Sequence, residues 1–469
     1  MEGAARNGDP AIAAGLGKSA TMATMASAND DAAAMLREYA ELLSITGGDP
    51  FRVRNYEKAA KAVGGYPGDL GAVPDAGLTK IPGVGKSIAG KLLELRRTGT
   101  IAAVDELRAT IPAGVQQIAR VSGIGPKRAL QLNRELGIAS VADLDAAVRA
   151  GRLRKVSGFG AKSEERILRV LTAVLRDQPL RDALAALPSD PSVEQIEAAL
   201  AANVPELADR AAAPAASTRA LVQVKDLRGD LHTHTSLTDG IETLETMVAA
   251  ARRRGYQYYA VTDHAPDLVM QQMTDEKMLA QREQVAALQD RAGLVLLHGT
   301  ELNIGPDGSV DWQAGFLAGF DICVASVHSS FDQDRATMTK RFVTAAENPS
   351  VNVIGHPLTR KLGRRPPVDV DFDALYEACG RTGTALEINA SPARMDLPPE
   401  HIGAARAAGV KFSIDSDAHS LTDLENIPYG VASARLAGLT DEDVINAWPL
   451  ERLQEFLRRP GALEYVTSE

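Results

Sequence analysis

The stretch "RGDLHTHTSLTDG", residues 228–240, decides the fold of the second half of the chain. Its apolar alternation predicts a strand, and His232 and His234 stand two positions apart on it. Both side chains therefore project from the same face. The chain has only eight histidines in 469 residues. A pair at this spacing, with Asp239 five residues later, indicates a shared functional role.

Seven strand-like runs begin with this stretch, and helical segments follow most of them. The runs are "RGDLHTHT", "YQYYAVTDH", "GLVLLHGTELNI", "FDICVASVHSS", "VNVIGHP", "TALEINA" and "VKFSIDSDAH". Repeated strand–helix units with apolar strands predict a parallel sheet, closed as a barrel or doubly wound. Six runs end in His, Asp or Glu, and the seventh ends in Asn389. The carboxyl ends of barrel strands share one rim, where chemistry is usually found.

The histidines follow these strand ends closely. Those at strand ends are His232, His234, His264, His298, His328, His356 and His419, whereas His401 falls in a helix. Interleaved carboxylates are Asp239, Asp263, Glu301 and Asp417. Neutral imidazoles and carboxylates are the usual ligands of Zn²⁺, Mn²⁺ and Fe²⁺. The pattern predicts a metal cluster, although for His298 we favour a core histidine bonded to the backbone.

Charge divides the chain into two parts. Residues 51–176 carry 22 Lys and Arg against 11 Asp and Glu, although the whole chain has a net charge of −10. The imbalance fits either two domains with different surfaces or a basic segment that meets a polyanion and an acidic one that holds cations. Two cysteines are too few for a disulfide framework, and residues 1–30 show no signal peptide. We expect a disordered tail, a cytoplasmic protein and no membrane span.

Three similar turns interrupt the short amphipathic helices of the basic part. They are "IPGVGKSIAGKL" (81–92), "VSGIGPKRALQL" (121–132) and "VSGFGAKSEERI" (156–167). In each, two glycines let the backbone approach a ligand, and a helix begins with unpaired N–H groups that favour an anion. A single such turn is usually only a tight helix connection. Three copies in a basic segment predict DNA binding through Gly83, Gly85, Lys86, Lys91, Gly123, Gly125, Lys127, Gly158 and Gly160.

These turns resemble the helix-hairpin-helix element, and residues 31–175 resemble the amino-terminal helical domains of X-family DNA polymerases. The resemblance implies that Lys91 lies where a family lysine can form a Schiff base with an abasic-site sugar; a simple phosphate contact is the alternative that we favour. The family's catalytic palm carries an Asp-x-Asp pair. Residues 177–225 are Ala- and Pro-rich and contain no such pair, so we expect no polymerase activity.

The order H-x-H, D, TDH, E, SVH, GHP and SDAH resembles the polymerase-and-histidinol-phosphatase (PHP) domain. That resemblance implies a distorted seven-stranded (β/α) barrel with two or three divalent ions, Zn, Mn or Fe. One ion would take His232, His234, Glu301 and Asp417. A second would share Glu301 and add His328 and His356, and a third would take Asp239, His264 and His419. Expected catalytic residues are His232, His234, Glu301, His328, Asp417 and His419.

Basic residues after "IGHP" and within "SPARMDLP" extend this resemblance. After "IGHP", a basic loop of Arg360, Lys361, Arg364 and Arg365 suits a DNA phosphate, with a solvated charge run as the alternative. Arg394 matches a family position near the substrate phosphate, so Arg360, Arg364 and Arg394 are the expected substrate-phosphate contacts. The phrases "RGDLHTHT", "ASVHSS" and "LEINASPARMDLP" resemble the PHP domain fused to bacterial X-family polymerases, which is a 3′–5′ exonuclease and can process abasic sites. Two ions suit phosphoester hydrolysis without a Ser or Cys nucleophile.

The expected fold is therefore multidomain, with an all-α helix-hairpin-helix region followed by an α/β barrel. We expect a tail over 1–30, helical domains over 31–100 and 101–176, a linker with a helix or two over 177–225, and a phosphoesterase domain over 226–469. The expected function is metal-dependent hydrolysis of DNA in repair, with DNA and DNA-repair proteins as expected partners. The alternatives are a histidinol-phosphatase-like enzyme with a small substrate and a non-catalytic DNA-binding adaptor.

Overall fold

The computed structural model describes residues 29, 31–66, 69–203 and 220–458 of the chain. Most of the predicted tail, residues 1–28 and 30, lies outside this described part. Contacts divide the chain into two compact units, each considered by itself. One comprises Met1–Arg120 and Ile124–Gly158, and the other comprises Val121–Gly123 and Phe159–Glu469.

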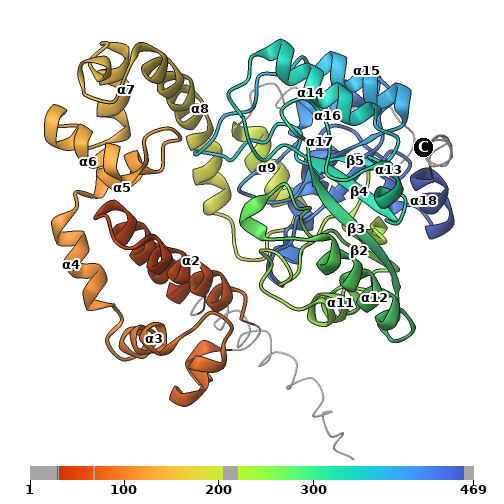
Figure 1. Ribbon diagram of the computed structural model, residues 1–469, viewed down its shortest axis with the longest axis horizontal. Coiled ribbons are helices and arrows are strands. Elements are labelled where there is room, and N and C mark those ends of the chain that lie inside the picture. The colour runs from red at the N-terminus through yellow and green to blue at the C-terminus, as the bar shows by residue number, and fades with distance from the viewer. Residues whose placement is uncertain (1–28, 30, 67–68, 204–219, 459–469) are drawn as a thin grey trace, which may run out of the picture. The chain divides into compact units, whose positions relative to one another are not determined.

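The first unit is built of short helices, and its described residues contain no strand (Figure 1). After a helix over residues 31–45 come α2 (Pro50–Gly64), η1 (Leu70–Ala72), η2 (Asp75–Lys80), α3 (Lys86–Thr98), α4 (Ala102–Thr110), α5 (Ala113–Ala119), α6 (Gly125–Leu136) and α7 (Val141–Arg149). Capping side chains and a proline mark the first residues of several of these helices. The Asp49 carboxylate accepts a hydrogen bond from the Phe51 N–H and Pro50 is the first residue of α2, while Ser140 caps α7.

The second unit begins with two helices and continues into a parallel barrel. The helices are α8 (Ala161–Ala185) and α9 (Val193–Asn203). The strands are β1 (Gly229–Asp230), β2 (Tyr258–Val261), β3 (Val295–Asn303), β4 (Ile322–Ser326), β5 (Val353–Ile354), β6 (Ala385–Asn389) and β7 (Phe412–Asp415). They pair in sequence order, and every pair of neighbours is parallel. The regular strands β1 and β5 are shorter than the runs that predicted them.

The first and last strands approach each other, so the barrel is nearly closed. Thr233 and Ala418 form a parallel bridge, and the His234 N–H donates to the Ala418 carbonyl at 2.9 Å. The Leu231 N–H donates to Asp415 Oδ1 at 2.8 Å. This confirms the predicted seven-stranded barrel and removes the alternative of a doubly wound open sheet.

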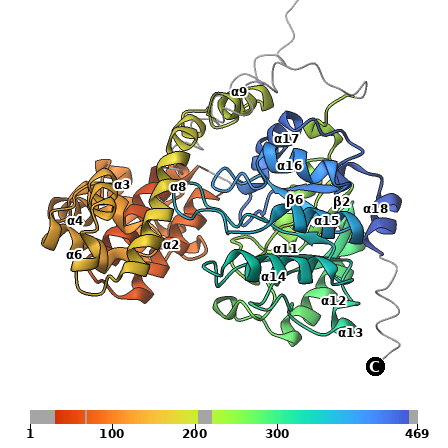
Figure 2. The same cartoon turned by 90° about the horizontal axis from the view of Figure 1, so that it is seen from above.

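Helices cover the outside of the barrel (Figure 2). They are α11 (Leu244–Arg253), α12 (Asp275–Ala292), α13 (Ala314–Leu317), α14 (Arg335–Glu347), α15 (Phe372–Thr382), α16 (Pro399–Ala407), α17 (Ile427–Leu436) and α18 (Leu450–Leu457). Buried apolar side chains from β4, β6 and β7 pack with those of α14 to α17 in the largest core cluster. Because helices and core fix the strands, the loops at the strand ends are held on a rigid frame.

The segment before the barrel also packs on it. Leu180 and Leu184 from α8, and Ile196 and Leu200 from α9, share an apolar cluster with Leu362, Met395 and Ala432 of the barrel. Helix α9 lies against α17 (Figures 1 and 2). Part of the stretch expected to be a linker therefore forms the wall of the second unit, because the apolar faces of its helices cover barrel side chains.

Candidate functional site

The histidine pair of the opening stretch lies at the carboxyl end of β1, inside the barrel mouth. His232 and His234 are both fully buried, and their ring centroids are 5.1 Å apart. His232 Nδ1 is 2.7 Å from Glu387 Oε1, which leaves Nε2 directed toward other carboxylates. His232 Nε2 is 3.5 Å from Glu301 Oε2, and His234 Nε2 is 3.3 Å from Asp417 Oδ1. The two imidazoles therefore face the same pair of acidic side chains, as the sequence spacing predicted.

Glu301, on β3, lies at the centre of the cluster. Its Oε1 is 3.0 Å from His356 Nε2 and 3.1 Å from His328 Nε2. Its Oε2 is 2.9 Å from His264 Nδ1 and 3.6 Å from His234 Nε2. Four strands thus bring histidines to one buried carboxylate, and the two oxygens of that carboxylate face different histidines.

A third group lies at the outer edge of the cluster. Asp239 Oδ1 is 3.4 Å from His264 Nε2 and 3.2 Å from His419 Nε2. The rings of His234 and His419 stack with centroids 4.2 Å apart. Asp239 comes from the loop after β1 and His419 from the loop after β7, and the Ile241 N–H donates to the His419 carbonyl at 2.8 Å. Closure of the barrel thus brings these two loops together.

The donor set fits divalent metal ions. Three groups of residues bring possible ligand atoms within 4.8 Å of one another. They are His234, Asp239, His264 and His419; His232, His234 and Asp417; and His264, Glu301 and His328. Two atoms that each bind an ion at about 2.1 Å stand roughly 3–3.5 Å apart, the spacing of most contacts above. The buried Nε2 atoms of His232 and His234 also have no hydrogen-bond partner among the described residues.

Burial and charge set the protonation of the cluster. Burial and the neighbouring His419 lower the pKa of His234 to about 4, and burial with Arg394 lowers that of His356 to about 3. Both rings are therefore neutral at pH 7, the form that binds a metal. Burial opposes protonation of His264, but Glu301 and Asp239 outweigh it and raise the pKa to about 10. Burial likewise opposes ionisation of Glu301, yet the surrounding histidines hold its pKa well below the usual range.

A second layer of polar groups holds the cluster in place, and sequence analysis did not identify it. Glu387 Oε1 contacts His232 Nδ1, and its Oε2 accepts a hydrogen bond from the His356 N–H at 2.5 Å. His328 Nδ1 is 2.8 Å from Asn303 Oδ1. The signal for Glu387 was an acidic residue two positions before Asn389 in an apolar strand, which places both on one face.

Asp263 serves the loops rather than the cluster. Its carboxylate accepts hydrogen bonds from the Thr235 N–H at 2.9 Å, the Thr235 hydroxyl at 2.6 Å and the Gln281 amide at 2.5 Å. Thr235 directly follows His234. Asp263 therefore fixes the backbone beside the histidine pair.

Two residues of the cluster have unusual backbone conformations. His356 has φ +29° and Asp417 has φ +52°. Positive φ values cost energy in residues with a Cβ and are concentrated at functional sites. Gly355 precedes His356, and a Cβ there would lie 2.3 Å from Ser326 Oγ. The backbone at these two strand ends therefore adopts unusual conformations at the residues whose side chains belong to the cluster.

The three arginines that were predicted to contact a phosphate differ in their surroundings. Arg394 Nε is 3.3 Å from Asp417 Oδ2, so this guanidinium lies beside the cluster. Arg364 is an exposed residue of the loop after β5. Arg360 is buried, and its guanidinium donates hydrogen bonds to the carbonyls of Arg394, at 2.8 Å, and Met395. Burial directs the Arg360 guanidinium toward these backbone acceptors, and its contact with a substrate phosphate stays a prediction.

His298 and His401 lie apart from the cluster. His298 is three positions before Glu301 on β3, an odd separation that places it on the opposite face. Its ring stacks on Phe320 with centroids 5.1 Å apart, and neither ring nitrogen has a hydrogen-bond partner in the described part of the chain. The expected backbone hydrogen bond is thus not formed by the ring. His401 lies on α16 and contacts the Tyr376 hydroxyl at 2.5 Å.

All three predicted hairpins form a tight turn followed by a helix. The first glycine of each turn has a left-handed conformation: φ is +78° at Gly83, +90° at Gly123 and +84° at Gly158. Gly85 caps α3 and Gly160 caps α8, whereas Gly125 is the first residue of α6. Lys86, Lys127 and Lys162 lie in the first turns of the three helices. Each hairpin therefore presents helical N–H groups beside a cation.

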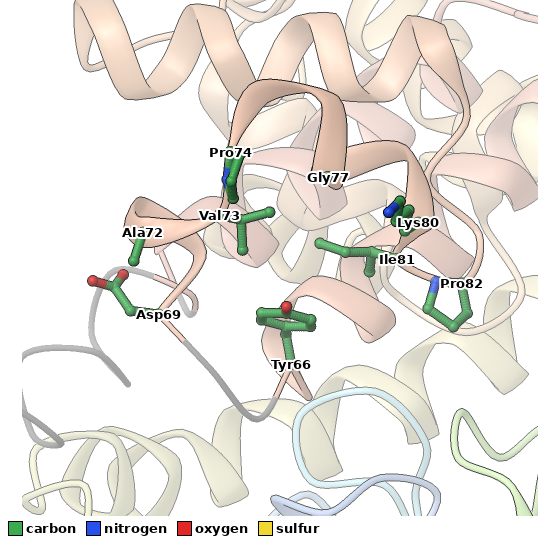
Figure 3. Close-up of a pocket in the computed structure, with 9 residues that line it drawn as sticks. All are labelled: Tyr66, Asp69, Ala72, Val73, Pro74, Gly77, Lys80, Ile81 and Pro82. Carbon is green, nitrogen blue, oxygen red and sulfur yellow. The ribbon is translucent and has the colours of Figure 1, made fainter.

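The first hairpin borders a hollow of about 720 Å³. Its lining includes Gly83, Gly85, Lys86, Arg52, Asn55 and Tyr56. A neighbouring hollow of about 480 Å³ shares Lys80, Ile81 and Pro82 with it and is largely apolar. In that second hollow the Tyr66 ring lies below Val73 and Ile81 (Figure 3). The basic hollow, not the apolar one, has the chemistry to hold a phosphate.

Lys91 lies on the buried side of the first hairpin helix. Its Nζ is 4.8 Å from the centre of the Tyr39 ring. Tyr39 also meets Tyr56 edge to face at 4.7 Å, and its hydroxyl is 3.1 Å from Arg52 Nη2. A cation over an aromatic face is a favourable contact for a charged amine. The lysine thus has a structural contact that does not depend on a sugar.

Comparison with known families supports these observations. The helix-hairpin-helix domain model matches residues 27–101, the tandem helix-hairpin-helix model matches residues 115–172, and the PHP domain model matches residues 230–391. Among the described residues, no helix is both long enough and apolar enough to span a membrane.

Curated relatives fall into two groups. The DNA polymerase/3′-5′ exonuclease PolX of Bacillus subtilis is 26% identical over 562 aligned positions, covering 91% of this chain and 98% of the relative. The aligned length exceeds the 469 residues of this chain, so the relative has residues without a counterpart here. A probable phosphatase of Shewanella sediminis is 29% identical over 50% of this chain and 94% of its own length, and the probable phosphatase YcdX of Escherichia coli K12 is 28% identical over the same shares. The chain thus consists of helix-hairpin-helix domains joined to a PHP domain.

Proposed function

We propose that the chain is a divalent-metal-dependent phosphoesterase that hydrolyses DNA and has no polymerase activity. The observation that carries the proposal is the convergence of nine competent side chains at one end of the barrel. They are His232, His234, Asp239, His264, Glu301, His328, His356, Asp417 and His419. Two or three ions of Zn, Mn or Fe would be held there, and bound ions would supply Lewis-acid activation of the phosphoester and of the attacking water.

The side chains of the site would divide the remaining work. Arg394, beside Asp417, is placed to orient a non-bridging phosphate oxygen. Glu387 fixes the tautomer of His232 by accepting from Nδ1, so that Nε2 is the atom offered to an ion. The walls of the mouth are buried side chains, which keep bulk water from competing with these contacts.

DNA as the substrate is supported by the basic helical part and by the relationship to PolX. The backbone N–H groups and lysines of three hairpins suit contacts with phosphates and carry no base specificity. Repair of DNA ends or abasic sites is the setting that fits a nuclease without a polymerase palm. For Lys91 we favour a phosphate-side or structural contact over Schiff-base chemistry, because its amine rests on the Tyr39 ring.

A small-molecule phosphatase is the second candidate, and the relatives named probable phosphatases favour it. Those relatives align with about half of this chain, 50% in each case. A small substrate would give no role to the basic helical half of this chain. A non-catalytic DNA-binding adaptor is the third candidate, but buried donors arranged in three groups exceed what a structural metal site needs.

The deciding experiment compares substrates under matched metal conditions. We expect the purified protein to degrade an end-labelled single-stranded oligonucleotide with Mn²⁺, Zn²⁺ or Fe²⁺, and to lose this activity in a chelator. A parallel assay with histidinol phosphate measures the second candidate. Faster hydrolysis of histidinol phosphate than of DNA under every metal would overturn the DNA assignment. Labels at each end, with and without an abasic site, report polarity and endonucleolytic cleavage.

A further inference from the structure

A tight turn over residues 361–365 lies in the loop between β5 and α15. The Lys361 N–H donates to the Arg365 carbonyl at 3.0 Å, and the Arg365 N–H donates to the Lys361 carbonyl at 2.8 Å. Gly363, at the tip, has φ +68°. These two hydrogen bonds hold Lys361 and Arg365 side by side across the turn.

The turn is anchored to the loop that carries Arg394. The Leu362 N–H donates to the Ala393 carbonyl at 2.8 Å. The Leu362 side chain is buried in the apolar cluster that contains Leu180, Leu184 and Met395. Because Arg394 is 3.3 Å from Asp417, a single loop separates the turn from the metal-binding cluster.

Helix α8 adds a further cation to the tip of the turn. A Cβ on Gly363 would lie 2.2 Å from Arg181 Nη1, so the guanidinium rests directly on this glycine. Arg181 Nη1 also donates to Gln178 Oε1 at 3.1 Å, which helps to fix its direction. A side chain at position 363 would displace this guanidinium, and the positive φ there also favours glycine.

Positive charge is concentrated at the turn, which contains Lys361, Arg364 and Arg365 and has Arg181 at its tip. Partial desolvation, together with the neighbouring Arg394 and Arg365, lowers the pKa of the Lys361 amine to about 8. Among the described residues, Lys361 forms no ion pair. Arg365 is turned back onto the turn itself, since its Nε donates to the Thr359 carbonyl at 2.7 Å and its guanidinium covers the Phe331 ring at 3.9 Å. A group of cations that lower one another's proton affinity suits an anionic ligand.

We propose that Lys361, on the turn over residues 361–365, and Arg181, on α8 at the tip of that turn, form a second phosphate seat for a phosphate of the substrate strand other than the one being hydrolysed. This inference rests on the proposed function and narrows its substrate class. The preferred substrate is an oligonucleotide with at least two phosphates, because a phosphomonoester or a dinucleotide can occupy only the position beside Arg394.

The seat also gives the docked end of α8 a role at the barrel mouth. Leu180 and Leu184 share an apolar cluster with Leu362 of the turn, and Arg181, between them in the sequence, lies at its tip. A barrel without this helix would keep the metal-binding cluster but would lose both the support and one cation. Specificity for a polymer is therefore built partly by residues outside the barrel sequence.

The test uses the full-length protein and thymidine oligonucleotides without terminal phosphates. The dinucleotide has one phosphate, the trinucleotide two and the tetranucleotide three. For the wild type we expect kcat/KM to rise about 10-fold from the dinucleotide to the longer substrates, the size of one solvent-accessible contact with a charged group. In Lys361→Gln and in Arg181→Gln the rise should shrink to about 3-fold or less.

The matched control is Arg291→Gln, which removes an exposed charge from the last turn of α12. It should keep the full 10-fold rise. The ratio between substrates does not depend on the fraction of folded enzyme, so a partly unfolded variant still gives a valid answer. Equal kcat/KM for all lengths in the wild type, or an undiminished rise in both variants, would overturn the second seat. Failure to cleave any of these oligonucleotides would instead refute the proposed DNA hydrolysis.

Discussion

The barrel and the hairpin region use charged side chains in opposite ways. In the barrel, Glu301 and the histidines around it are buried and held by further polar groups such as Glu387. In the hairpins, the lysines are exposed and the geometry that the three turns share lies in the backbone, where Gly83, Gly123 and Gly158 adopt left-handed conformations. Chemistry at phosphorus needs fixed, desolvated groups, whereas a grip on a nucleic-acid backbone needs only accessible charge and N–H groups.

This contrast implies that the two activities can be separated by mutation. Loss of one buried ligand should remove hydrolysis and leave the exposed surfaces intact. Loss of exposed lysines should weaken DNA binding and leave the cluster intact.

The largest effect is expected for His234→Ala. His234 contacts both Glu301 and Asp417, so its loss opens the centre of the cluster. We expect hydrolysis of a labelled oligonucleotide to fall by at least about 10³-fold, since several kcal/mol of transition-state stabilisation depend on the ions. Binding of the same oligonucleotide, measured by fluorescence anisotropy, should stay within about twofold.

His298→Ala is the matched control, because it removes a buried imidazole from the other face of β3. It should lower Tm through the cavity left beside Phe320 while the folded enzyme keeps its activity. If His234→Ala lost binding and hydrolysis together, the division between the two regions would be refuted.

The sequence was sufficient to predict the barrel and the members of its cluster. His264, His328 and His356 stand at ends of apolar runs, and a parallel barrel must bring such ends to one rim. Glu387 was overlooked because a strand interior gives no sign of which side chain supports another. The burial of Arg360 was not foreseen, because a basic loop does not reveal which guanidinium donates to backbone carbonyls. Those distinctions arise only from tertiary packing.

The same limitation applies to the helices before the barrel. An Ala-rich stretch without the palm motif predicted a linker, and the apolar residues Leu180 and Leu184 could equally have served helix–helix contacts. Their partners in the structure include Leu362 and Met395. Met395 is more than two hundred positions further along the chain. Local patterns cannot identify contacts at such separations.

Glu387→Gln tests whether the second layer of the barrel matters as much as its buried position suggests. The substitution keeps the shape but removes the charge that faces His232 Nδ1. We expect affinity for Mn²⁺, measured by titration with electron paramagnetic resonance, to fall about 10- to 100-fold, the usual effect of such partners. Circular dichroism should show a retained fold.

Glu377→Gln changes an exposed glutamate of α15; it is the control and should bind Mn²⁺ normally. Unchanged affinity in Glu387→Gln would show that the cluster is organised by the ligands alone.

The smallest effect is expected in the hairpin region, from the combined change Lys86→Gln, Lys127→Gln and Lys162→Gln. Each lysine stands in the first turn of a hairpin helix, so each can neutralise one phosphate. For single-stranded DNA, each lost contact should reduce the slope of log affinity against log salt by about 0.7, or about 2 for the three together. Affinity at moderate salt should fall roughly tenfold. Hydrolysis of a chromogenic phosphodiester, which requires no binding of a polymer, should be unchanged because the barrel cluster is intact.

A control that removes three exposed lysines of the second unit, Lys225, Lys277 and Lys340, should leave the slope close to that of the wild type. An unchanged slope in the hairpin variant would mean that DNA is held elsewhere, and the exposed charge of the hairpins would then need another explanation.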